Sequence, residues 1–283
     1  MPTMKIIKRR IESVNSTKQI MKAMYLVASS KLQKAKTQLD YIRPLFNNIK
    51  LVMDGIQAWG EMVNNVFVEK RPVKSVGYLV ITSDRGLCGG YNINIAKEAL
   101  EHIKASGKEE KIIAVGAKGY EYLRRRRINV VHRYQGITDE SVFKDAENIG
   151  ELMLNMYTHG EVDEVYIVYT GFGSIMAHEP RIVRFLPVET SQETEGYHHL
   201  MTYEPDVNTF MTYAMPMYLN ISVYGAMVES AVCEQASRMT SMDAATRNAT
   251  EIIDDLTLDF NRKRQGLITQ GITEIVSGAN ALQ

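Results

Sequence analysis

A glycine-rich segment near residue 85 is the part of this sequence whose residue types and spacing could do chemistry. Residues 82–92 read TSDRGLCGGYN and follow an apolar run, VKSVGYLVIT at residues 73–82, which has the composition of a buried strand. A strand, then glycines, then a helix is the order in which α/β proteins hold phosphate groups. The first hypothesis is therefore a nucleotide site.

The spacing of the glycines argues against that hypothesis. Gly86, Gly89 and Gly90 match neither the dinucleotide fingerprint nor the P-loop pattern, and no Lys-Ser or Lys-Thr pair follows them. Asp84 and Arg85 fit a turn or a contact with a partner better than a phosphate site. An α/β nucleotide-binding enzyme with coiled-coil arms stays as the alternative function, and we expect no cofactor.

Other reactive side chains form no recognisable centre. Cys88 would be reactive at a helix N-terminus, but no basic partner is arranged around it, so we predict a buried structural thiol. Two cysteines are too few for a disulfide framework, and the six histidines show no metal-ligand spacing. Four consecutive arginines, residues 124–127, fit the end of a helix, where cations are favoured. We expect no catalytic residue, no metal and no nucleic-acid partner.

Charge is balanced over the chain but not along it. Lysine and arginine number 33, as do aspartate and glutamate. Residues 1–36 nevertheless hold nine basic side chains and one acidic one, whereas residues 189–206 hold five acids and no lysine or arginine. This asymmetry indicates that the N-terminal end meets an acidic protein surface, with a solvated basic helix face as the alternative.

A heptad stripe fills the N-terminal part of the chain. From Ile7 to Ile56, apolar residues recur in alternating steps of four and three, and only Lys18 interrupts them. The pattern predicts one coiled-coil helix, bent at Pro44, with a length of about 80 Å. A domain made from the roughly 150 central residues would be only about 40 Å across. The helix must therefore project beyond that domain and needs a partner.

The remainder of the chain predicts an α/β domain and a second long helix. Strand-like and helix-like segments alternate between residues 73 and 188, which indicates βαβ units and a mostly parallel sheet. Residues 189–206 form a polar connector. Residues 207–228 carry no charge but include Pro216 and several polar side chains, so they fit the start of a helix better than a membrane span.

The second helix carries its own apolar pattern. Ala245, Ala249, Ile252 and Leu256 follow one phase, and the apolar residues from Ile268 onward follow another, with a slip across residues 260–265. Two long helices on either side of a compact domain pair most economically as an antiparallel coiled coil. The predicted segments are an N-terminal coiled-coil helix at 1–58, the α/β domain at 73–188, the connector at 189–206 and a C-terminal coiled-coil helix at 207–283.

Three separated motifs closely resemble the γ subunit of F-type ATP synthases. They are IESVNSTKQIMKAMYLVASSKLQKA at residues 11–35, ITSDRGLCGGYN at 81–92, and the C-terminal run that begins EQASRMTSMDAATRN at 234 and continues through FNRKRQGLITQGITEIVSGANAL to residue 282. The resemblance covers essentially the whole chain. It implies a Rossmann-like α/β domain at the foot of an antiparallel coiled coil, and a non-catalytic rotor shaft.

The resemblance also implies partners and a location. The coiled coil would enter a ring of three α and three β subunits. The foot would sit on the c-ring beside the ε subunit, so the membrane is reached only through the c-ring. Ion flow would turn ring and shaft, and the shaft would drive ATP synthesis or hydrolysis in the β subunits. With neither a secretory signal nor a transit peptide seen, we expect a peripheral complex on the cytoplasmic face of a bacterial cell membrane.

Residues at partner contacts follow from the same motifs. Met24 resembles the position that faces an acidic lever loop of the β subunits, and Lys18 and Lys22 would suit that loop. Arg264 and Gln265 resemble the residues that meet a catch loop on β. The remaining expected contacts are Arg238, Gln270 and Thr273, which match positions tied to coupling, Tyr203 and Glu204 at the c-subunit loops, and Cys88 with its loop in the foot.

One departure from the family pattern lies near the C-terminal end. Gly271 occupies a position where the family usually has glutamate. Glycine in a helix interior costs about 0.5–1 kcal/mol relative to alanine, so this part of the helix is expected to be less rigid. The apolar residues around it would turn in a collar of α and β subunits.

Overall fold

The structure, a computed structural model, describes residues 4–57, 66–68, 71–138, 141–174, 178–188 and 206–281. The elements in chain order are α1 (Met4–Gln57), β1 (Ser75–Ile81), α2 (Tyr91–Ser106), β2 (Glu109–Val115), α3 (Ala117–Arg125), β3 (Val130–Tyr134), α4 (Phe143–Thr158), β4 (Glu164–Phe172), β5 (His178–Leu186) and α5 (Val207–Ala281). This order confirms the predicted fold class, an α/β domain between two long helices. The segment boundaries proposed from the sequence stay a prediction.

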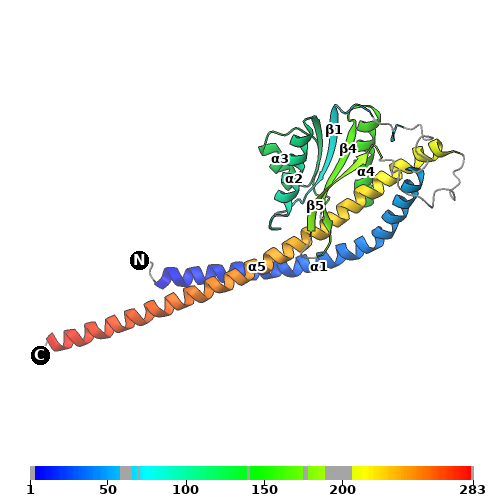
Figure 1. Cartoon of the computed structure of the whole chain (residues 1–283). Coiled ribbons are helices and arrows are strands. Elements are labelled where there is room, and N and C mark those ends of the chain that lie inside the picture. The colour runs from blue at the N-terminus through cyan, green and yellow to red at the C-terminus, as the bar shows by residue number, and fades with distance from the viewer. Residues whose placement is uncertain are drawn as a thin grey trace. The chain divides into compact units, whose positions relative to one another are not determined.

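The chain divides into two compact units, and both long helices contribute to each. One unit contains Met1–Ala28 and Met239–Gln283, and the other contains Ser29–Arg238. We refer to the first as the helical unit and to the second as the α/β unit. Figure 1 labels the helices α1 to α5 and the strands β1, β4 and β5.

The α/β unit is built on a five-stranded sheet with the strand order β3-β2-β1-β4-β5 (Figure 1). β1 pairs in parallel with β2 and β4, and β2 pairs in parallel with β3. β5 runs antiparallel to β4 at one edge. All seven residues of β1 are buried, as expected for a central strand whose two faces are both covered. The Rossmann-like order 3-2-1-4 explains why β1 is the most apolar strand.

Side chains of β1 alternate between two cores. Tyr78 and Val80 pack with α2 and with Leu123 of α3 on one face. Leu79 and Ile81 pack with α4 and α5 on the other face. The first turns of α5 supply several fully buried residues to that second core, namely Met211, Met215, Leu219 and Val223. The start of α5 is therefore part of the α/β core as well as of a long helix.

The heptad stripe of α1 is confirmed over the side chains that the structure describes. Every stripe position from Ile7 to Ile49 is buried or half-buried, including Lys18, while most positions between them are exposed. The helix continues through Pro44, so the prediction of one helix is confirmed. Stripe positions beyond Ile49 lie outside the described side chains.

Within the α/β unit the two long helices run antiparallel. Lys31 and Lys34 of α1 line one hollow with Gln235, near the later part of this α5 segment. Ile42 and Phe46, farther along α1, line another hollow with residues that begin at Tyr218 of α5. Residues later in α1 thus lie beside residues earlier in α5, which is the antiparallel arrangement. The amide of Gln38 donates to the hydroxyl of Tyr224 over 2.6 Å and ties the two helices together.

Within the helical unit, the inward face of α5 differs by one residue from the face predicted. Met242 and Ala249 are buried, and the inward face continues through Ile253 and Leu256, both half-buried. Ile252 is 45% exposed, so its assignment to the stripe was wrong. The choice between neighbouring isoleucines depends on how α5 meets its partner, which periodicity over two turns does not fix. In the described part of the chain, no helix has the length and apolarity needed to cross a membrane.

Candidate functional site

The glycine-rich loop after β1 is organised by one carboxylate. Asp84 Oδ1 accepts a hydrogen bond from the amide of Ala117 over 3.0 Å, at the first residue of α3. Its Oδ2 accepts from the amide of Gly136 over 2.9 Å and from the Thr138 hydroxyl over 2.8 Å. Asp84 therefore joins the loops that follow β1, β2 and β3 at the carboxyl end of the sheet.

Two polar residues that flank the loop, Ser83 and Asn92, bond to each other. The amide of Ser83 donates to Asn92 Oδ1 over 2.9 Å, and Asn92 Nδ2 donates back to the Ser83 hydroxyl over 2.7 Å. The N-terminus of α3 faces the carboxylate of Asp84, and this negative charge opposes a phosphate at the same place. The geometry supports a structural role for this loop.

Replacing Asp84 by alanine is expected to lower the free energy of unfolding by about 3 kcal/mol. The change leaves several donors without their charged acceptor, and hydrogen bonds to charged groups contribute about 1.5–3 kcal/mol each. Chemical denaturation of the full chain measures the effect. Glu98→Ala, on the exposed face of α2, is the control and should change stability by less than about 0.5 kcal/mol. Equal stability of the two variants would contradict this role for Asp84.

Arg238 ties this loop to α5. Its guanidinium forms an ion pair with Glu234 one helical turn earlier, with 2.6 Å between Nη2 and Oε1. The same nitrogen donates to the carbonyl of Gly86 over 3.3 Å. Arg238 and Cys88 are 7% and 2% exposed. In this chain both side chains are internal, and the partner contacts expected from the sequence stay a prediction.

The two cysteines are separate buried thiols. Cys88 lies in the loop and accepts a hydrogen bond from Asn92 Nδ2 over 3.2 Å, while Cys233 donates to the carbonyl of Thr170. Burial raises the pKa of the Cys88 thiol, and it raises the pKa of Cys233 well above the usual value. Because the thiolate is the nucleophile, both groups should be inert, as predicted for Cys88.

We therefore expect the native chain to resist alkylation. At pH 8, a maleimide should label Cys88 and Cys233 at least about tenfold more slowly in the folded chain than in denaturant. Mass spectrometry of timed samples measures both rates. A Lys108→Cys variant, at an exposed position after α2, provides a reactive control in the same sample. Equal rates for the native cysteines with and without denaturant would show that they are accessible.

The other expected contacts lie on the long helices. In the helical unit Lys18 and Met24 are half-buried and Lys22 is exposed, while Arg264 and Gln265 are exposed on α5. Two more exposed side chains of α5 bond within the helix: Gln270 donates to Glu274 over 2.8 Å, and Thr273 donates to the carbonyl of Thr269 over 2.9 Å. Tyr203 and Glu204 lie outside the described residues. The described residues on the long helices thus lie in the helical unit, whereas Cys88 and Arg238 lie in the α/β unit.

The helical unit also exposes many large apolar side chains. Ile275 of α5 is 74% exposed, an unusual position for isoleucine in a folded chain. Exposed neighbours on the same helix are Leu258, Leu267, Ile268, Ile272 and Val276, and α1 exposes Ile20, Leu26 and Val27. Exposed apolar residues in such number mark a surface that binds another protein. The α1 residues were not singled out from the sequence, although their place outside the heptad stripe was a usable signal.

Comparison with known proteins identifies relatives along the full length. A family model described as ATP synthase matches residues 3–282. The ATP synthase gamma chain of Alkaliphilus metalliredigens is 43% identical over 99% of both chains. The sodium-ion-specific ATP synthase gamma chain of Acetobacterium woodii is 40% identical over 98% of this chain and 97% of the relative.

A solved structure is similar as well. It is the central stalk and c-ring of the mitochondrial ATP synthase of Tetrahymena thermophila, of which one chain is 25% identical with a TM-score of 0.63. The match covers 80% of the chain described here and 99% of the Tetrahymena chain.

Proposed function

Because the chain belongs to the family of ATP synthase gamma chains, it is a central-stalk subunit of an F-type ATP synthase, and we propose that it is the shaft that turns inside a ring of three α and three β subunits. The chain itself would break and form no covalent bonds. Its task would be to carry rotation between an ion-driven ring and the catalytic subunits.

The apolar surface of α5 is the observation that carries this proposal. From Gly266 to Asn280 only Gly271 is even half-buried, so no other described part of the chain covers the apolar side chains on this length of helix. Ile268, Ile272 and Ile275 nevertheless point outward along it. A sleeve of surrounding subunits would bury them. Because apolar contact is non-directional, such a sleeve can hold the helix end while allowing it to rotate.

Unequal faces of the helical unit would make the rotation productive. A basic α1 face with Lys22, next to half-buried Met24 and Lys18, differs from the face of α5 with Arg264 and Gln265. Each β subunit would therefore meet a different surface at any moment. Shifting a two-state subunit from 1:99 to 99:1 takes a difference of about 5.5 kcal/mol in contact energy. A few charged and apolar contacts that exist in one state only can supply that difference.

The α/β unit would form the foot. We propose that it contacts the c-ring and the ε subunit, with Tyr203 and Glu204 at the c-subunit loops. The complex would lie on the cytoplasmic face of the bacterial cell membrane and reach the membrane only through the c-ring. Within this unit Arg238 would hold the Gly86 loop against α5, since it bonds to the Gly86 carbonyl and to Glu234 of α5.

Co-expression with α and β subunits tests the proposal. We expect one copy of this chain to co-elute with three α and three β subunits, and ATP hydrolysis to rise strongly when it is present. A chain that hydrolyses nucleotide alone would support the alternative enzyme with coiled-coil arms. A chain that only self-associates would support a coiled-coil scaffold, and either outcome would overturn the rotor proposal.

A further inference from the structure

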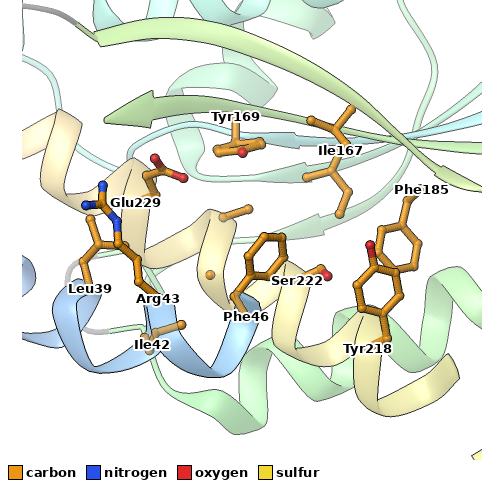
Figure 2. Close-up of a pocket in the computed structure, with 13 residues that line it drawn as sticks. Leu39, Ile42, Arg43, Phe46, Ile167, Tyr169, Phe185, Tyr218, Ser222 and Glu229 are labelled. Atoms are coloured by element: carbon orange, nitrogen blue, oxygen red, sulfur yellow. The ribbon is translucent and has the colours of Figure 1, made fainter. Parts of the chain in front are cut away.

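A cavity lies in the α/β unit where α1, α5 and the β4–β5 side of the sheet meet (Figure 2). Its volume is about 100 Å³. Its walls are mainly apolar and aromatic, and the side chains that matter most are Ile42, Phe46, Ile167, Phe185, Tyr218 and Ser222. Val183, which is 42% exposed, also borders the cavity and marks a path to solvent.

The charged groups at one end of the cavity are already satisfied. Figure 2 shows Arg43 and Glu229 together at that end, and Phe185 and Tyr218 at the other. Glu229 accepts a hydrogen bond from the amide of Phe172 over 2.8 Å, and Arg43 donates to the carbonyl of the same residue over 3.4 Å. These two side chains therefore fix the rim and leave the interior to neutral groups.

Ser222 is the polar group of the interior without a partner. It is 8% exposed, and among the described residues nothing bonds to its hydroxyl. Thr212, Thr246 and Thr250 of the same helix instead donate to the carbonyl four residues earlier. Figure 2 shows Ser222 between the rings of Phe46 and Tyr218. A buried hydroxyl without a hydrogen bond costs about 1–3 kcal/mol in folding free energy. A ligand with a polar group beside Ser222 would supply the missing hydrogen bond.

Gly225 keeps the cavity open. A Cβ atom at this position would meet only Ile42 Cγ2, at 3.9 Å, so packing does not require glycine here. Glycine in a helix interior costs about 1 kcal/mol relative to alanine. Two positions on α5 thus lower the stability of the folded chain. Gly225 does so as a glycine in a helix, and Ser222 does so because its hydroxyl faces the cavity without a hydrogen bond. An occupant that bonds to Ser222 would remove the second of these costs.

We propose that this cavity binds a small, uncharged, mainly apolar alcohol, of which phenol is the simplest probe. A closed apolar cavity of about 150 Å³ holds benzene. This cavity is smaller, about 100 Å³, but it is open past Val183, so one ring or a short branched chain would bind with one edge toward solvent. The rings of Phe185 and Tyr218, stacked at 4.8 Å, provide a flat wall for an aromatic ring. The hydroxyl of the ligand would pair with Ser222.

An occupant of this cavity would touch both long helices and the sheet at once. Because it would bind the folded chain and not the unfolded one, it would raise the apparent stability of the α/β unit in proportion to its concentration. The inference concerns the cavity alone and does not depend on the proposed rotor function.

Nuclear magnetic resonance of the full chain, labelled on isoleucine methyl groups, tests the proposal. Phenol should shift the Ile42 and Ile167 signals in a saturable way, and toluene, of the same size without a hydroxyl, should bind more weakly. Ser222→Ala should weaken phenol binding about fivefold and leave toluene binding unchanged, because one hydrogen bond is lost. Gly225→Leu should abolish binding of both probes by filling the cavity.

Gly266→Leu is the matched control, since Gly266 lies on the same helix and a Cβ there meets nothing within 4 Å. It should bind phenol as the natural chain does. Absence of saturable shifts at Ile42 and Ile167, or full phenol affinity in Gly225→Leu, would overturn the proposal. Should Gly225→Leu fail to fold, Ser222→Ala decides the question, because equal loss of phenol and toluene binding, or no loss of either, would equally overturn it.

Discussion

Replacing Glu234 by alanine is expected to lower the free energy of unfolding of the α/β unit by about 3–5 kcal/mol. The side chains of Arg238 and Glu234 are only 9% and 2% exposed, so the variant leaves a buried guanidinium without its counter-charge. Arg238 would keep its hydrogen bond to the Gly86 carbonyl. A carbonyl oxygen is an uncharged acceptor, so this bond cannot replace the ion pair with the carboxylate.

A second ion pair on the same helix provides the control. Asp243 and Arg247 have the same spacing, but their side chains are 49% and 71% exposed. Asp243→Ala should therefore cost less than about 1 kcal/mol. A double variant, Glu234→Leu with Arg238→Met, should recover most of the loss, because it removes both buried charges. Denaturant unfolding measures all three variants, and equal effects at Glu234 and Asp243 would contradict the account.

Replacing Gly116 by alanine is the second change with a large expected effect, a loss of about 3–5 kcal/mol. Gly116 has φ of +90°, which side chains rarely adopt, and an added Cβ would overlap the carbonyl oxygen of Thr82. Such backbone strain costs about 1–3 kcal/mol, and overpacking costs a similar amount. Thr82 cannot move aside freely, since its amide and its hydroxyl both donate to the carbonyl of Val115 over 2.8 Å.

Two other glycines separate the contributions at Gly116. Gly136 also has a positive φ, +79°, but a Cβ there meets nothing within 4 Å, so Gly136→Ala should show the strain alone. Gly86 has neither restriction, and Gly86→Ala should stay within about 0.5 kcal/mol of the natural chain. Thermal unfolding measures all three variants. Equal stabilities of Gly116→Ala and Gly86→Ala would contradict the prediction.

Features that depend on local repetition could be predicted from the sequence. The heptad stripe of α1 was correct from Ile7 to Ile49 because each stripe position is separated from the next by a fixed number of residues. β1, β2 and β4 were recognised as short runs rich in apolar residues next to helix-like segments. The antiparallel direction of β5 was not predicted, since its apolar pattern is the same in either direction.

Features that depend on distant residues could not be predicted. The role of Asp84 comes from donors at residues 117, 136 and 138, which only the folded sheet brings to one edge. The burial of Arg238 depends in the same way on Gly86, 152 residues away. The sequence therefore identified the glycine-rich loop as unusual but did not show its role. In the structure, the loop connects the ends of the strands to one another and to α5.

The two units of the chain have different requirements, and these explain the distribution of buried and exposed groups. In the α/β unit, internal hydrogen bonds hold the glycine-rich loop after β1, and both cysteines are buried. The helical unit leaves isoleucines and leucines exposed along α5. A rigid unit joined to a helix with an uncovered apolar surface is what a rotating shaft with a foot requires.

Rotation of this chain inside the α and β ring is the most direct test of the account. Cys88 and Cys233 are buried, so a probe can be attached specifically at Lys108→Cys in the α/β unit. With the ring fixed to a surface and ATP supplied, we expect the probe to turn continuously in one direction. Hydrolysis at the normal rate with a stationary probe would contradict the central claim that this chain is the shaft.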